Sequence, residues 1–141
     1  QTMFRKILVP TDFSKKHINP LEIAANLSSK YESAIHLLHV VEIIADTTFA
    51  EYEDFYGKME IRAQKRMSSL IASQQKKAVR IIPSIVYGNR VQEILKFVKR
   101  NKIDLIIMNS HKVAMNNPIQ SWGTISYKVA LLSDCPIMLV K

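Results

Sequence analysis

The chain has 141 residues, 48% of them hydrophobic, which fits one ordinary domain with a core that needs neither disulfides nor a metal. Its single cysteine excludes an internal disulfide, and no apolar run approaches the ~20 residues of a membrane span. The net charge of +8 comes from bases spread over many segments, Lys65 and Arg66 among them, without a nucleic-acid-binding motif, so we expect solvated surface rather than nucleic-acid binding.

The first part of the chain predicts a strand, a helix and a second strand. Residues 4–10 (FRKILVP) form a short apolar run of the kind that becomes a buried strand. The following segment, residues 14–30, has helical spacing, but proline is tolerated only in a first turn. Because Pro20 lies inside this segment, we expect the regular helix to begin near Asn19. Residues 34–41 (AIHLLHVV) then predict the second strand.

The middle of the chain predicts a long helix, a strand, a helix and a strand. Residues 51–74 place apolar side chains at steps of three and four, as on one face of a helix. A third strand is expected over residues 79–86 and a fourth over residues 104–108. Between them, Asn89 with Gln92 three residues later matches the pattern that starts a helix.

The end of the chain predicts a last helix from Trp122 to Leu132 and a last strand from Pro136 to Val140. Strands that alternate with helices pair in parallel and carry helices on both faces of the sheet. We therefore expect one α/β domain over residues 1–141, with a doubly wound, five-stranded parallel sheet. These patterns do not give the order of the strands.

Ligands of such sheets bind beyond the carboxyl ends of the strands, where the strand order reverses. The segments to inspect therefore leave the first, second and fourth strands, at residues 10–14, 40–42 and 109–124. In these segments and beyond them, six pieces of sequence follow in this order: residues 7–14 (ILVPTDFS), 37–42 (LLHVVE), 87–95 (YGN…EIL), 104–111 (DLIIMNSH), 123–124 (GT) and 135–141 (CPIMLVK). With these pieces in this order, the chain resembles the universal stress protein family.

The resemblance implies a five-stranded sheet like that of the adenine nucleotide alpha hydrolases, and dimers formed through the last strand. In one branch of the family it also implies bound ATP. Asp12 after the first strand and main chain near Val41 are similar to the positions that hold the nucleoside in that branch. We add their neighbours at the same edge, Thr11 and Met108, to the expected site.

The phosphate loop departs from the pattern of that branch, which is Gly, two residues, Gly, nine residues, Gly, then Ser or Thr. Asn109 and Lys112 stand at the first two glycine positions, and Gly123 with Thr124 follows one residue late. Glycine lets the backbone approach a phosphate, so its loss predicts weak or absent ATP binding. In the alternative, Lys112 or His111 replaces the backbone donors with a charged side chain.

These observations favour a stress-response regulatory domain that acts as a homodimer, paired through Pro136 to Val140, by binding rather than by turnover. The first alternative is an ATP-binding switch of the same fold with slow hydrolysis. The second is a nucleic-acid-associated basic protein. Ser14 and Thr124 have no obvious catalytic base, so we expect no catalytic residues. Partner proteins are expected but not identified, and a membrane partner is not expected.

The histidines and the cysteine predict packing rather than chemistry. His36 and His39 are three residues apart on a strand, so they point to opposite faces and cannot share one metal. Cys135 is expected to be a packed thiol and not a nucleophile. The single cysteine and the opening residues Gln1 to Lys6, which lack the apolar stretch of a signal peptide, favour the cytoplasm.

Overall fold

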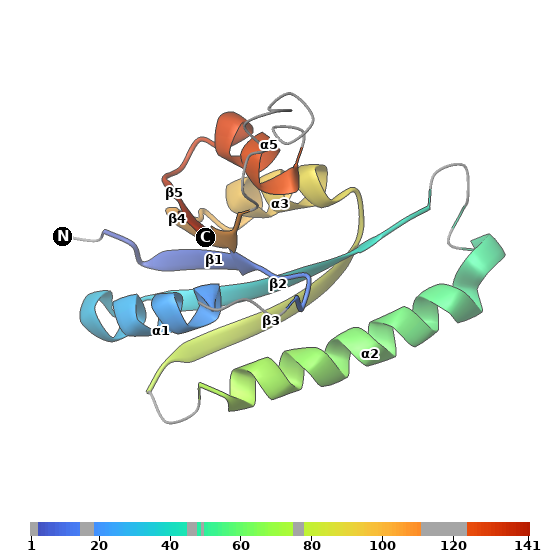
Figure 1. Ribbon diagram of the computed structural model, residues 1–141, viewed down its shortest axis with the longest axis horizontal. Helices are drawn as coiled ribbons and strands as arrows, with labels where there is room; N and C mark the ends of the chain where they lie inside the picture. The colour runs from blue at the N-terminus through green and yellow to red at the C-terminus, as the bar shows by residue number, and fades with distance from the viewer. Residues whose placement is uncertain (1–2, 15–18, 45–47, 49, 75–77, 111–123) are drawn as a thin grey trace.

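The computed structural model describes residues 3–14, 19–44, 48, 50–74, 78–110 and 124–141 (Figure 1). Within these residues a five-stranded parallel sheet has the order β3-β2-β1-β4-β5, so β3 and β5 are its edges. The strands are β1 (Lys6–Pro10), β2 (Ala34–Glu42), β3 (Arg80–Gly88), β4 (Leu105–Asn109) and β5 (Ile137–Val140). The predicted parallel sheet is confirmed, and its central strand is the first one in the chain.

Helices cover both faces of the sheet, as the alternating pattern predicts (Figure 1). The helical segments are α1 (Pro20–Tyr31), the 3₁₀ turn η1 (Ala50–Tyr52), α2 (Glu53–Ala72), α3 (Arg90–Arg100) and α5 (Ile125–Leu132). One face carries α1 and α2, and the other carries α3 and α5. In the described part of the chain, no helix combines the length and apolar character that crossing a bilayer requires.

Two apolar layers hold the helices on the sheet. On one face Ile7 and Val9 of β1 pack with α1 and α2, and on the other Leu8 packs with α3 and α5. All three side chains are almost completely buried. This explains why the apolar run of β1 shows no alternation, because a strand covered on both faces needs an apolar residue at every position.

Two helices start where the sequence predicts, whereas α2 begins at Glu53 rather than at residue 51, after the 3₁₀ turn, and the last helix begins later than expected. Asn19 caps α1 by accepting a hydrogen bond from the Leu21 N–H at 2.9 Å, and Asn89 caps α3 by accepting one from Gln92 at 3.1 Å. The last helix was expected from Trp122, which lies outside the described residues. Its described part, α5, begins only at Ile125, because the residue before it has extended backbone with φ −68° and ψ 157°.

The strand boundaries also move by one or two residues. β1 begins at Lys6 rather than at the expected Phe4, whose φ of 56° is left-handed and cannot continue a strand. β3 extends to Gly88, where φ is 147° and an added Cβ would lie 2.9 Å from the Glu93 Cγ. Glycine is therefore required where β3 turns into α3.

β1 and β4 separate toward their carboxyl ends. Ile7 of β1 pairs with Leu105 of β4, and Leu8 pairs with Ile106, where the pairing of the two strands ends. The Lys6 carbonyl accepts from Asp104, the residue before β4, while the Thr11 N–H donates to β2, so even-numbered residues of β1 face β4. Pro10 is the next even residue, and it has no N–H to donate. The proline thus removes the hydrogen bond that would hold the two strands together at this point.

At the opposite end, one carboxylate ties the two strands together. Asp104 accepts hydrogen bonds from the Arg5 and Lys6 N–H groups, both at 3.0 Å, and its own N–H donates to the Lys6 carbonyl. We expect Asp104→Ala to lower the free energy of unfolding by about 1–2 kcal/mol, because two charge-assisted hydrogen bonds are lost at a partly exposed position. Urea denaturation measures the change. The matched control Asp134→Ala, at an exposed turn, should change it by less than ~0.5 kcal/mol, and an equal loss in both variants would contradict this role.

Candidate functional site

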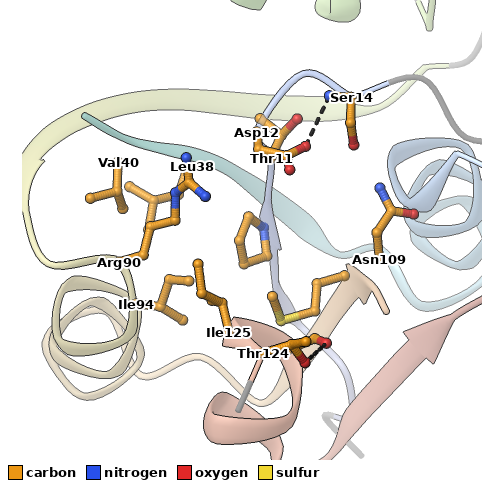
Figure 2. A pocket seen from close by; sticks show the side chains of 13 residues that line it. Thr11, Asp12, Ser14, Leu38, Val40, Arg90, Ile94, Asn109, Thr124 and Ile125 are labelled. Carbon is orange, nitrogen blue, oxygen red and sulfur yellow. Dashed lines mark hydrogen bonds between the residues drawn. The ribbon is translucent and has the colours of Figure 1, made fainter. Parts of the chain in front are cut away.

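A cavity of about 300 Å³ opens where β1 and β4 separate (Figure 2). It lies on the α3 and α5 side, at the edge where parallel sheets bind ligands. Its lining combines apolar strand residues with the polar residues of the β1 exit and the starts of α3 and α5. The lining residues are Pro10, Thr11, Asp12, Ser14, Leu38, Val40, Arg90, Ile94, Met108, Asn109, Thr124, Ile125 and Ser126.

Five of the residues that the sequence singles out line this one cavity: Thr11, Asp12, Met108, Asn109 and Thr124. Figure 2 shows Asp12 and Thr124 at opposite ends of it, with Asn109 along one side. They come from three segments far apart in the chain, and the separation of β1 from β4 brings them together.

Four other expected residues have a different outcome. Val41 is buried but does not line the cavity, which takes Leu38 and Val40 from β2 instead. The resemblance implicates main chain near Val41, and by strand alternation the Val41 side chain points to the opposite face of the sheet. The remaining three, His111, Lys112 and Gly123, lie outside the described residues.

Asp12 is held as a carboxylate by the turn that follows β1. The Ser14 N–H donates to its Oδ1 at 2.9 Å, and the Phe13 N–H donates to the Thr11 hydroxyl at 3.0 Å. Burial raises the pKa of Asp12, but hydrogen bonds from Ser14 and the positive charge of Arg90 lower it more, so the net pKa lies below its ordinary 3.8. At neutral pH this side chain is an ionised acceptor for hydroxyl or N–H groups of a ligand.

Arg90 is the main residue of the site that sequence reasoning missed. It is the first residue of α3, directly after the Asn89 cap, and it lines the cavity near Leu38 and Val40 (Figure 2). The ligand-binding segments expected from the sequence leave the first, second and fourth strands, whereas Arg90 follows the third strand, β3. A base placed just after Gly88 and Asn89 is the signal that could have revealed it.

Asn109 and Thr124 face the cavity from β4 and from the start of α5. The Asn109 Oδ1 atom is buried, and no hydrogen-bond partner is recorded for it among the described residues. The Thr124 hydroxyl lies 3.4 Å from the Ser126 hydroxyl, and Thr124 does not cap α5 with its side chain. Both side chains therefore have hydrogen-bonding capacity to offer to a ligand.

The two histidines of β2 lie on opposite faces, as expected. His39 packs on Phe13 at 4.5 Å between ring centroids, with its Nδ1 2.8 Å from the Thr11 carbonyl oxygen, whereas His36 meets Phe97 edge-on at 5.5 Å. Both rings are partly buried. Within the described residues, no cluster of three histidine, cysteine or acidic side chains is arranged to hold a metal.

Burial lowers the pKa of each histidine below its ordinary 6.5. The charges of Lys6 and Arg80 add to the effect at His36. At His39 the hydrogen bond to Thr11 and the charge of Asp12 oppose it, while two arginines, Arg90 and Arg66, support it. The remaining candidate, Cys135, is a free thiol that packs against the core on the α3 and α5 side, as expected.

In comparisons with known proteins, this chain matches the universal stress protein family in both sequence and fold. The profile of the Universal stress protein family matches residues 3–141. Universal stress protein YxiE of Bacillus subtilis is 26% identical over 99% of this chain and 100% of its own.

Solved structures agree in fold. Universal stress protein UspA from Lactobacillus plantarum superposes with a TM-score of 0.81 at 19% identity, covering 100% of both chains. A universal stress protein from Archaeoglobus fulgidus, described as a complex with dAMP, superposes with a TM-score of 0.71 at 17% identity, covering 99% of both chains. At these identities the two structures show a shared fold alone.

The lowered histidine pKa values predict a stability that depends on pH. A group whose pKa is lower in the folded than in the unfolded chain stabilises the fold fully above the unfolded value of 6.5, and this stability is lost as the pH falls below it. We expect the free energy of unfolding to be smaller at pH 5.5 than at pH 7.5. The variant His36→Gln with His39→Asn, which keeps an amide near each ring-nitrogen position, should reduce the difference in urea denaturation. An unchanged difference in this variant would assign the pH dependence to other groups.

Proposed function

Because this chain belongs to the universal stress protein family, we propose that it is a stress-response regulatory domain that acts by binding a nucleotide rather than by turnover. The observation that carries the proposal is the convergence of five residues singled out by the sequence on one cavity at the β1–β4 edge. The dAMP complex of the Archaeoglobus fulgidus relative supports a nucleotide as the ligand. The lone free thiol, Cys135, fits a reducing compartment, so we propose the cytoplasm as its location.

The nucleoside is the part of the ligand that this cavity suits best. The Asp12 carboxylate is able to accept hydrogen bonds from ribose hydroxyls, which a neutral amide would accept more weakly. The apolar side chains of Val40, Ile94 and Met108 offer a surface for a flat base. Arg90 supplies a positive charge for a phosphate in the same cavity. The volume of about 300 Å³ lies at the lower end of small-molecule sites.

The triphosphate of ATP is held weakly in this proposal. Asn109 stands where the ATP-binding branch of the family has a glycine, and its Cβ and amide occupy space that a phosphate would need close to the backbone. Lys112 stands at the second glycine position in the sequence. A charged side chain there loses rotamer freedom when it holds a phosphate, and this offsets part of its attraction.

We expect calorimetry to give a dissociation constant for ATP above roughly 100 μM. The triple variant Asn109→Gly, Lys112→Gly with Ala114 deleted restores the glycine spacing and should tighten ATP binding.

For AMP, Asp12→Asn should weaken binding about ten-fold, because charge-assisted hydrogen bonds to the ribose become neutral ones. The matched control Asp134→Asn, at an exposed turn, should leave AMP binding unchanged.

The rival function is an ATP-binding switch with slow hydrolysis. It predicts tight ATP binding by the wild type, lost on Lys112→Gly, together with release of phosphate over hours. That result would overturn the weak-triphosphate proposal. Absence of AMP binding by the wild type would overturn the nucleotide proposal as a whole.

We also propose that the domain acts as a dimer paired through β5. In this edge strand the carbonyls of Pro136 and Val140 accept from β4, so odd-numbered residues direct their backbone groups outward. An exposed row of this kind is a template for pairing with another strand, and a two-fold axis lets two copies pair with each other. Large apolar side chains in β5 and in the helix that precedes it in the sequence are exposed to solvent: Leu131 is 80% exposed, Leu132 61% and Met138 39%.

We expect a dimer in dilute solution, measured by light scattering or sedimentation at micromolar concentration. Replacing Leu131 and Met138 by glutamate should raise the dimer dissociation constant at least ten-fold, because four like charges would face each other at the interface. Ile61→Glu, at an apolar residue of α2 that is 54% exposed, is the matched control and should leave the dimer intact. A monomeric wild-type protein would contradict the proposal.

A further inference from the structure

We propose that a second cavity, on the α1 and α2 side of the sheet, is a binding site for a small organic anion with an apolar, aromatic body. This cavity measures about 680 Å³, well within the range of small-molecule sites. It is bounded by the end of β1, the start of α1 and the carboxyl-terminal half of α2. It shares Pro10, Thr11, Ser14 and Asn109 with the first cavity, so the two lie back to back where β1 and β4 separate.

The floor of the second cavity is apolar and fixed. Val9, Leu21 and Leu37 are at most 2% exposed, and all three line it. Leu70 of α2 and Pro20 of α1 extend this surface toward the rim. Such a lining favours the apolar body of a ligand, because burying it removes apolar surface from water.

Phe13 forms an aromatic wall that several contacts hold in place. Its φ of 65° is left-handed, a conformation that an aromatic residue adopts only when its surroundings enforce it. The Thr11 hydroxyl accepts from its N–H, His39 packs on its ring, and the Arg66 guanidinium carbon lies 5.8 Å from the ring centroid. A strained residue held by so many contacts is typical of binding sites.

Positive charge gathers on one side of this cavity. Lys65 and Arg66, adjacent residues of α2, both line it, and neither forms an ion pair with an acid of the described residues. The start of α1 contributes little attraction, because the Asn19 side chain caps the Leu21 N–H and Pro20 has no N–H. The two side chains are therefore the groups that would attract an anion.

Asn109 supplies a polar group on the wall between the two cavities, since its buried Oδ1 has no recorded partner among the described residues. The ligand class follows from these groups together. A carboxylate, sulfonate or phosphate monoester would face Lys65 and Arg66, while an aromatic body lies against Phe13 and Leu70. A neutral ligand of the same shape would use the apolar lining but would gain nothing from the two cations.

The fluorescent probe 8-anilinonaphthalene-1-sulfonate has this chemistry, and N-phenyl-1-naphthylamine is the same body without the sulfonate. We expect the native protein to bind one equivalent of the sulfonate. Lys65→Gln with Arg66→Gln should weaken it about five-fold, the loss expected for two solvent-exposed cations. The control pair Lys58→Gln with Arg62→Gln makes the same charge change elsewhere on α2 and should weaken it less than two-fold. Binding of the neutral probe should be equal in wild type and in both pairs.

A second pair of variants tests the location. Ser69 lines the cavity and Ser68 does not, although both are exposed residues of α2. Ser69→Trp should fill the cavity and abolish sulfonate binding, whereas Ser68→Trp should leave it unchanged. Circular dichroism and thermal unfolding of each variant verify that the fold is retained.

Three results would overturn this proposal: equal weakening by the two glutamine pairs, binding that survives Ser69→Trp, or weakening of sulfonate binding by Asp12→Asn, since Asp12 lines the first cavity and not the second. The last would place the probe in the first cavity. Failure of AMP to bind at all would leave the anion site standing, so the two proposals are tested separately.

Discussion

The missing N–H of Pro10 is the constraint on which both cavities depend. In a parallel sheet each strand hydrogen-bonds alternately to its two neighbours, and the residue at this position should donate to β4. Proline cannot donate, and the next N–H groups on both strands, β1 and β4, point away from the gap, because Thr11 donates to β2 and Ser110 donates to β5. The sheet opens between them at the point where its strand order reverses, and each face of the sheet gains a hollow there.

The turn after β1 distributes its side chains between the two hollows. Asp12 lines one cavity and Phe13 the other, and the left-handed backbone at Phe13 makes this division possible. Each cavity has its own positive charge: Arg90 near Asp12 in the first, and Arg66 over Phe13 together with Lys65 in the second. Burial lowers the pKa of His39, and the positive charges of Arg90 and Arg66 add to this effect.

Sequence patterns predict the elements of this fold well because each element depends on local chemistry. An Asn cap beside Pro20 or before Arg90 fixes a helix start whatever the rest of the chain does. The order of the strands depends on which edges meet, and no residue pattern records that. Lys65 and Arg66 show the same limit, because a base on a helix is solvated surface until a neighbouring element makes it the wall of a cavity.

Asn109 is one of the four residues that line both cavities, and it is also where the chain departs from the glycine pattern of the ATP-binding branch of the family. A glycine at this position would let a phosphate approach the backbone in the first cavity, but it would offer no side chain to the second. The asparagine side chain restricts that approach and places an amide on the wall that both cavities share. Its Oδ1 has no hydrogen-bond partner among the described residues, so it can accept a hydrogen bond from a ligand N–H or O–H that reaches it. The substitution that weakens a triphosphate therefore also favours a ligand of different chemistry.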